Sequence, residues 1–90
     1  PATVERVRRR EIEEAEEVLS KEDIKASSMS FYPSHVEVYL DTGVKTFISS
    51  EKNIINSIKV LVLILRQISL EGRQPRSVDL RYDKVIVSYD

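Results

Sequence analysis

The stretch that decides the fold is Ser77-Val78-Asp79-Leu80-Arg81-Tyr82-Asp83-Lys84-Val85-Ile86-Val87-Ser88-Tyr89. Val78, Leu80 and Tyr82 alternate with polar residues, which is the period of a half-buried β-strand. A short polar break, Asp83-Lys84, is followed by three β-branched residues, so we predict two strands that meet at a tight turn. We expect the second strand to lie at a sheet edge, where its N–H and C=O groups can accept a strand from another protein.

An earlier hairpin is indicated by residues 35–48. Val36, Val38 and Leu40 alternate with polar or amphipathic residues, which predicts a strand over residues 35–40. Asp41-Thr42-Gly43 is a turn signal, since glycine adopts positive φ without strain, and residues 44–48 read as the returning strand. Before this hairpin, residues 24–32 predict an irregular or edge strand, and Pro33-Ser34 predicts a turn.

Residues 4–19 predict an amphipathic helix capped by Thr3 and ended by residues 20–23. Its apolar positions are Val4, Val7, Ile12, Ala15, Val18 and Leu19. The basic cluster Arg6, Arg8, Arg9 and Arg10 is followed by a run of glutamates. We interpret these charges as a solvated helix face, since the glutamates largely cancel the field of a phosphate-binding patch.

A second helix is predicted from about Lys52 to Leu70. Ser49-Ser50-Glu51 is its expected start signal, and Gly72 is placed to stop it. The apolar content exceeds one face, because Val60, Leu63 and Ile64 extend around the helix. We expect burial against both the sheet and the first helix, and contact with a neighbouring domain is the alternative.

The order of elements predicts an α+β fold, α-β-β-β-α-β-β, with two helices packed on one face of a mostly antiparallel sheet. Ninety residues make one small domain, residues 1–90. The predicted core is Val38, Leu40, Ile58, Leu61, Val62, Leu65, Leu80 and Ile86 or its neighbour.

Composition narrows the function. Fourteen Lys and Arg residues stand against 15 Asp and Glu, and a net charge of −1 argues against a nucleic-acid binder driven by bulk charge. The chain has no cysteine, which excludes disulfides and thiolate chemistry, and no segment has the length of a membrane span. Since residue 1 is Pro1 and no signal peptide is present, we expect a processed product or a piece of a larger protein.

No catalytic constellation is recognisable in the sequence. His35 is the one histidine, no serine has a histidine partner in a known arrangement, and the two glycines stand apart at turns. The glutamates of the first helix face water, where nothing raises their pKa for acid catalysis. We therefore expect a protein that is not an enzyme and uses no metal and no cofactor.

Three segments give the chain a resemblance to a known family: the hairpin at residues 36–45, the amphipathic helix around residues 54–70, and Ser77-Val78-Asp79-Leu80-Arg81-Tyr82-Asp83. Over about residues 11–89 the chain resembles the β-domain of the bacterial cell-division protein FtsQ, called DivIB in Gram-positive bacteria. Family members usually carry Gly at the position of Ser49 and in the turn occupied by Asp83-Lys84, so we expect a differently shaped turn.

What the resemblance implies is a non-catalytic scaffold of the division machinery at the septum. The parent would be a single-pass membrane protein with a POTRA domain before this domain, which would lie on the extracytoplasmic side. Family partners are the FtsB/FtsL pair, or DivIC as the counterpart of FtsB, and they add a strand to the last strand of the β-domain. By motif, Tyr82 matches the family's binding tyrosine, Arg81 and Asp83 flank it, and Lys84, Val85, Val87 and Ser88 belong to the docking edge.

From the residues alone, two interpretations of this edge remain open. Tyr82 is either an interface anchor or a tyrosine at the rim of the core, and the last strand is either a docking edge or a packed strand guarded by Lys84. An alternative function is an α+β ligand-binding or nucleic-acid-binding accessory module that uses the sheet face or the arginines at residues 6–10.

Overall fold

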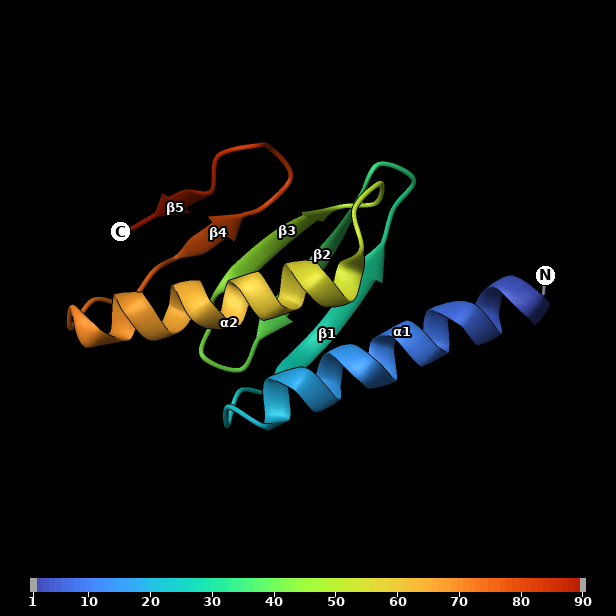
Figure 1. Cartoon of the computed structure of the whole chain (residues 1–90), viewed down its shortest axis with the longest axis horizontal. Coiled ribbons are helices and arrows are strands. Elements are labelled where there is room, and N and C mark those ends of the chain that lie inside the picture. Colours follow the sequence, from blue (N-terminus) through green and yellow to red (C-terminus); the bar gives the residue numbers. More distant parts are fainter. Residues whose placement is uncertain (1, 90) are drawn as a thin grey trace.

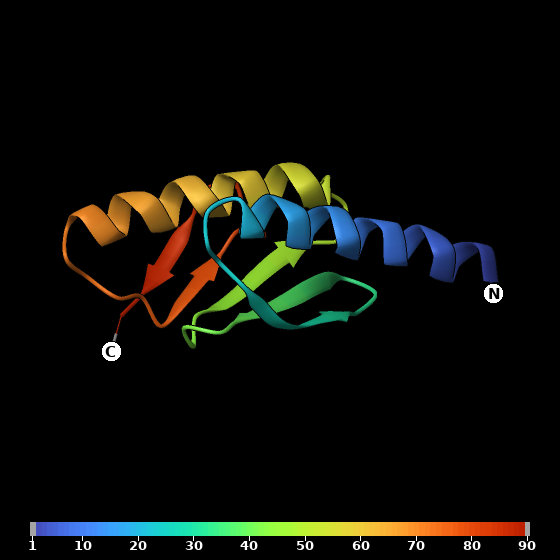
Figure 2. The ribbon, with the colours of Figure 1, turned by 90° about the horizontal axis from the view of Figure 1, so that it is seen from below.

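The computed structural model describes the backbone of residues 2–89 and the side chains of residues 9–89. In this range the elements are α1 (Ala2–Ser20), β1 (Ala26–Phe31), β2 (His35–Leu40), β3 (Lys45–Ser49), α2 (Ile54–Leu70), β4 (Ser77–Asp79) and β5 (Ile86–Ser88). Both helices lie on the same side of a single sheet (Figure 1, Figure 2). The predicted α+β class and element order are confirmed.

The five strands lie in the order β1-β2-β3-β4-β5, so spatial order follows chain order. Three of the neighbouring pairs are antiparallel, and β3 pairs with β4 in parallel. The parallel pair has a simple cause: α2 forms the connection between these two strands, and a helical crossover returns the chain to its starting end. The edges of the described sheet are therefore β1 and β5.

The hairpin of β2 and β3 has the predicted form. Val36, Val38 and Leu40 are buried on the helix side, and Val38 lies opposite Thr46 in the register. Gly43 adopts φ of +94° at the turn, and its N–H donates to the Leu40 carbonyl at 2.9 Å. The prediction of β1 as an irregular edge strand is also confirmed, because its register shifts between Ala26 and Ser28.

Helix α1 begins at Ala2, so the prediction that Thr3 caps it is wrong: Thr3 lies inside the helix. Ala15 and Leu19 are fully buried against the rest of the core, as the apolar pattern predicts. The helix ends at Ser20, inside the predicted range, and the Ile24 N–H then donates to the Leu19 carbonyl. The structure describes side chains from residue 9 onward, so the predictions for Val4, Arg6, Val7 and Arg8 fall outside the described range.

Helix α2 begins later than predicted. Ser49 is the last residue of β3, where it lies opposite His35, and the Ser50 hydroxyl donates to the Pro33 carbonyl. Neither serine is therefore free to cap the helix, and Asn53 takes this role by accepting the Asn56 N–H at 3.0 Å.

The end of α2 is as predicted. Gly72 follows the helix with φ of +73°, and its N–H donates to the Ser69 carbonyl at 2.9 Å. The Arg73 N–H donates to the Ile68 carbonyl at 3.2 Å, which completes the paired hydrogen bonds of a Schellman motif. Glycine is required here because this left-handed conformation is costly for other residues.

The core lies between the helix layer and the sheet. Its buried apolar members are Ala15, Leu19, Val36, Val38, Leu40, Val44, Ile48, Ile58, Leu61, Val62, Val78 and Leu80. Of the predicted set, Leu65 is only partly buried, and Ile86 is 50% exposed. The prediction named Ile86 or its neighbour. Ile86 lies opposite Asp79 on the open face of the sheet, and its neighbour Val87 lies on the core side, opposite the buried Val78.

The prediction of a tight turn between the last two strands is wrong. Strand β4 ends at Asp79 and β5 begins at Ile86, so residues 80–85 form a long irregular connection (Figure 1). Leu80 continues the buried side of β4, but the chain then leaves the sheet. Tyr82 consequently does not share the core side with Val78 and Leu80, and it is 56% exposed.

Candidate partner-binding edge

Strand β5 is held to the sheet on one side only. It pairs antiparallel with β4, with Ser77 opposite Ser88, Val78 opposite Val87 and Asp79 opposite Ile86. No described strand lies beyond it, because β5 is the last in the order of the sheet. The predicted edge position of this strand is therefore present in the structure.

The direction of the main-chain groups of β5 follows from the hydrogen bonds of β4. The Lys45 N–H donates to the Arg76 carbonyl at 3.1 Å, and the Leu80 N–H donates to the Phe47 carbonyl at 2.8 Å. The Arg76 carbonyl and the Leu80 N–H, which flank β4, point to β3, so Val78 between them also faces β3. Because main-chain groups alternate along a strand, Ser77 and Asp79 bond to β5.

The same alternation fixes β5 itself. Ile86 and Ser88 lie opposite Asp79 and Ser77, so their N–H and C=O groups point toward β4. The Arg76 N–H donates to the Ser88 carbonyl at 2.7 Å, which agrees with this direction. The N–H and C=O of Val87 therefore point outward, where an added strand would find a donor and an acceptor on one residue.

The connection between β4 and β5 is tied to the start of α2. The Lys52 ammonium donates to the carbonyls of Leu80 and Tyr82, each at 3.1 Å. These two bonds hold the main chain on either side of Arg81, while the Tyr82 side chain stays exposed. The structure therefore presents Tyr82 from an anchored segment. Its exposure is compatible both with an interface anchor and with a tyrosine at the rim of the core whose hydroxyl reaches water.

Arg81 is engaged within the domain. Its Nη2 donates to Asp79 Oδ2 at 2.7 Å and its Nε to Asp79 Oδ1 at 3.0 Å, and the guanidinium lies 4.9 Å from the centre of the Phe47 ring. These hydrogen bonds hold the pKa of the Asp79 carboxyl below its usual range. Arg81 thus orders the start of the connection, and a partner that pairs with it must share it with Asp79.

The predicted site residues divide into three groups. Tyr82, Asp83, Lys84, Val85 and Ser88 are exposed, Val87 is half-buried with an outward main chain, and Arg81 is half-buried on the open face. The structure brings them together along one side of the molecule, on β5 and the connection before it (Figure 1). Ile86, which lies between the predicted residues, adds an exposed apolar side chain.

Beside this edge, a groove of about 400 Å³ separates the first half of α2 from residues 80–85. Its apolar lining includes Val60 from the helix and Tyr82 and Val85 from the connection, and all three are exposed. The sequence pattern did identify Val60 as surplus apolar surface on α2. It did not show that this residue lies near the edge strand, because that proximity depends on the long connection.

The open face of the sheet carries a polar and aromatic cluster at its other end. His35 stacks on Tyr32 with ring centres 4.9 Å apart, and its Nε2 lies 2.9 Å from Glu37 Oε2. The Tyr39 hydroxyl donates to Glu37 Oε1 at 2.9 Å. The hydrogen bonds from His35 and Tyr39 lower the pKa of Glu37. The Glu37 carboxylate also lies 3.9 Å from the Lys45 ammonium, so its charge is paired within the cluster.

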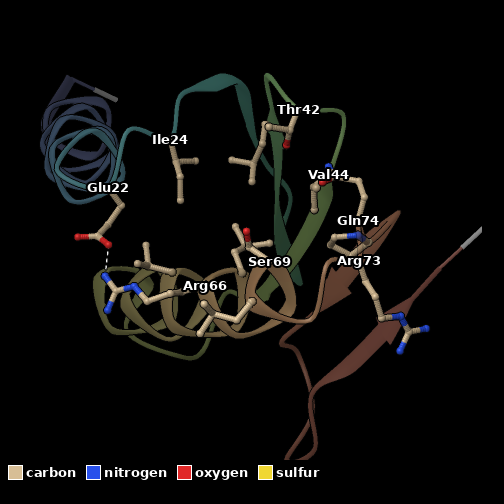
Figure 3. Close-up of a pocket in the computed structure, with 13 residues that line it drawn as sticks. Glu22, Ile24, Thr42, Val44, Arg66, Ser69, Arg73 and Gln74 are labelled. Atoms are coloured by element: carbon tan, nitrogen blue, oxygen red, sulfur yellow. Dashed lines mark hydrogen bonds and ion pairs between the residues drawn. The ribbon is translucent and has the colours of Figure 1, made fainter.

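A second cavity, of about 360 Å³, lies at the opposite end of α2 (Figure 3). Its walls come from Ile24, from the β2–β3 hairpin and from the last turns of α2. An ion pair between Glu22 and Arg66 closes one side, and the Arg73 side chain points away from the space. Arg73 instead stacks on Tyr89, 3.6 Å from the ring centre, so it offers no cation to the cavity.

Residues able to hold a metal do not gather in the described part of the chain: no group of three His, Cys, Asp or Glu side chains is found there. Among the described residues, no helix is both long and apolar enough to cross a membrane. No protein-family model matches the chain, and no curated protein matches it.

Proposed function

We propose that this chain is a non-catalytic scaffold domain of the bacterial division machinery that binds a partner by strand addition to β5. The observation that carries the proposal is the outward N–H and C=O of Val87 at the edge of the sheet, beside exposed Tyr82 and Val85. Main-chain pairing provides attraction at such an edge, and neighbouring side chains provide specificity. The resemblance of residues 77–83 to FtsQ and DivIB supplies the partner class, FtsB/FtsL or DivIC-like proteins.

The proposed setting follows from the same resemblance. The domain would belong to a larger single-pass membrane protein and would lie on the extracytoplasmic side, with no enzymatic activity of its own. The isolated domain would be a monomer. The structural support for the proposal is the edge strand together with Lys52, which fixes the segment that carries Tyr82.

Nucleic-acid or ligand binding at the open sheet face is less favoured. Its two cations, Lys45 and Arg81, lie beside Glu37 and Asp79, which reduce the attraction for phosphate. Arg9 and Arg10 of the N-terminal basic cluster are exposed, but glutamates follow them directly. Binding to RNA that weakens steeply with salt would favour this second function.

Calorimetric titration with the extracytoplasmic fragment of an FtsB- or DivIC-like protein tests the proposal. Val87→Pro removes the outward N–H but leaves the hydrogen bonds of Ile86 and Ser88 to β4 in place, and proline is tolerated on edge strands. We expect the variant to stay folded and lose binding. Val87→Ala is the matched control, since it shortens the side chain and keeps the N–H. A folded Val87→Pro variant that binds as tightly as the parent would exclude strand addition at β5.

A further inference from the structure

The flank of α2 that faces residues 80–85 carries one exposed apolar side chain, Val60, among polar ones. Val60 is 42% exposed, although it belongs to a helix whose neighbouring positions Ile58, Leu61 and Val62 are buried. Val60 lines the groove of about 400 Å³ together with Tyr82 and Val85, which are also exposed. Exposed apolar residues that line one groove are typical of an interaction site, whereas single scattered apolar residues are common on any protein surface.

The geometry of strand addition determines which side of an added strand would meet this groove. Val87 lies opposite Val78, whose side chain is fully buried on the helix side of the sheet. Residues directly opposite one another in neighbouring strands point to the same face. A partner residue opposite Val87 therefore points to the helix side, and so does every second residue along the partner strand.

The groove has the chemistry of an apolar subsite. The Lys52 ammonium at its border already donates to the carbonyls of Leu80 and Tyr82, and the Asn53 side chain already accepts the Asn56 N–H. Lys52 and Asp83 bring one charge of each sign to the lining, so the groove favours neither a cation nor an anion, and a charged side chain would lose hydration over Val60 and Val85. An apolar side chain would instead cover Val60 and Val85 and remove apolar surface from water.

We propose that the partner strand is two-sided, with apolar residues at its helix-facing positions, one of which fills the groove between Val60 and Val85. This inference rests on the proposed function, because the added strand brings that side chain to the groove. It goes further by assigning α2 a part in recognition and by stating the pattern of the partner. Polar residues are expected at the alternate positions, which would face the open side beside Ile86 and Ser88.

Two variants of the intact chain separate this inference from the proposed function. Val60→Ser removes apolar surface inside the groove. Leu70→Ser is the matched control, because Leu70 is 79% exposed on the same helix but lines the other cavity. Each variant is titrated with the same FtsB- or DivIC-like fragment. We expect Val60→Ser to weaken binding about fivefold or more, as for a residue at an interface centre, and Leu70→Ser to leave it unchanged.

The outcomes are distinct. If the parent binds but Val60→Ser binds equally well, the groove has no part in recognition while strand addition stands. Equal weakening by both serine variants also contradicts the inference, since it indicates a general effect of surface polarity. If the parent chain does not bind, the proposed function fails and the inference fails with it. Val60→Trp, which fills the groove, provides an independent check and is expected to weaken binding without lowering stability.

Discussion

Thr46→Val is predicted to stabilise the domain. Thr46 lies in the middle of β3, opposite Val38 on one side and beside Val78 on the other, and it is fully buried. Its hydroxyl oxygen has no hydrogen-bond partner among the described residues. Valine has nearly the same shape as threonine, so the substitution removes a buried polar group without opening a cavity.

The magnitude follows from two contributions. A buried hydroxyl without a partner costs about 1–3 kcal/mol, and a newly buried methyl group contributes about 0.8 kcal/mol. Since the unfolded chain also changes, we expect the free energy of unfolding to rise by about 1–2 kcal/mol, which corresponds to an increase of several degrees in Tm for a domain of this size. Thr46→Ser keeps the hydroxyl and loses the methyl, so it should lower the free energy of unfolding by about 1 kcal/mol.

Urea denaturation followed by circular dichroism measures both variants, provided that the m-value is unchanged. A Thr46→Val variant that is less stable than the parent by about 1 kcal/mol or more would refute the reasoning. It would mean that the hydroxyl forms a hydrogen bond in solution, with a buried water or with a neighbouring carbonyl.

Three further predictions concern the core, the Asp79 carboxyl and Tyr82. Leu61→Ala should lower the free energy of unfolding by about 2–5 kcal/mol in urea, because Leu61 is fully buried, and a loss below about 0.5 kcal/mol would show that it is exposed. The folded-state pKa of Asp79 is lowered by Arg81, so its contribution to stability is complete above about pH 4 and is lost as pH falls through the folded-state pKa. The stability difference between the parent and Asp79→Asn should therefore shrink below about pH 4, and a constant difference in acid denaturation would contradict it. Tyr82→Ala should weaken partner binding by about 2 kcal/mol or more in calorimetry while the circular dichroism spectrum stays the same, and unchanged affinity would exclude Tyr82 as an anchor.

Much of the fold could be predicted from the sequence where a pattern was long and periodic. The strand His35–Leu40 and the end of α2 follow from strict alternation and from Gly72, and both are as predicted. The start of α2 could not be predicted in this way. Ser49 and Ser50 are good capping residues, but Ser49 lies in β3 opposite His35 and the Ser50 hydroxyl donates to the Pro33 carbonyl. Asn53 caps the helix instead.

The candidate site was predicted in part. The two strands around Val78 and Val87 follow from alternating and β-branched residues, and β5 lies at the edge of the described sheet as expected. Tyr82 was placed by parity on the core side, and this failed because β4 ends at Asp79 and parity has no meaning in an irregular connection. Lys52 and Val60 could not be predicted as neighbours of the edge, since the sequence does not show where a long connection crosses a helix.

Amide hydrogen exchange at Val87 is the most direct test of the central claim. In the free domain the Val87 N–H points outward from the edge strand, whereas the Ser88 N–H points toward β4. The account predicts that Val87 exchanges rapidly in the free domain and becomes protected when the FtsB- or DivIC-like fragment binds, while the protection of Ser88 changes little. A bound complex in which Val87 still exchanges as rapidly as in the free domain would contradict strand addition at β5.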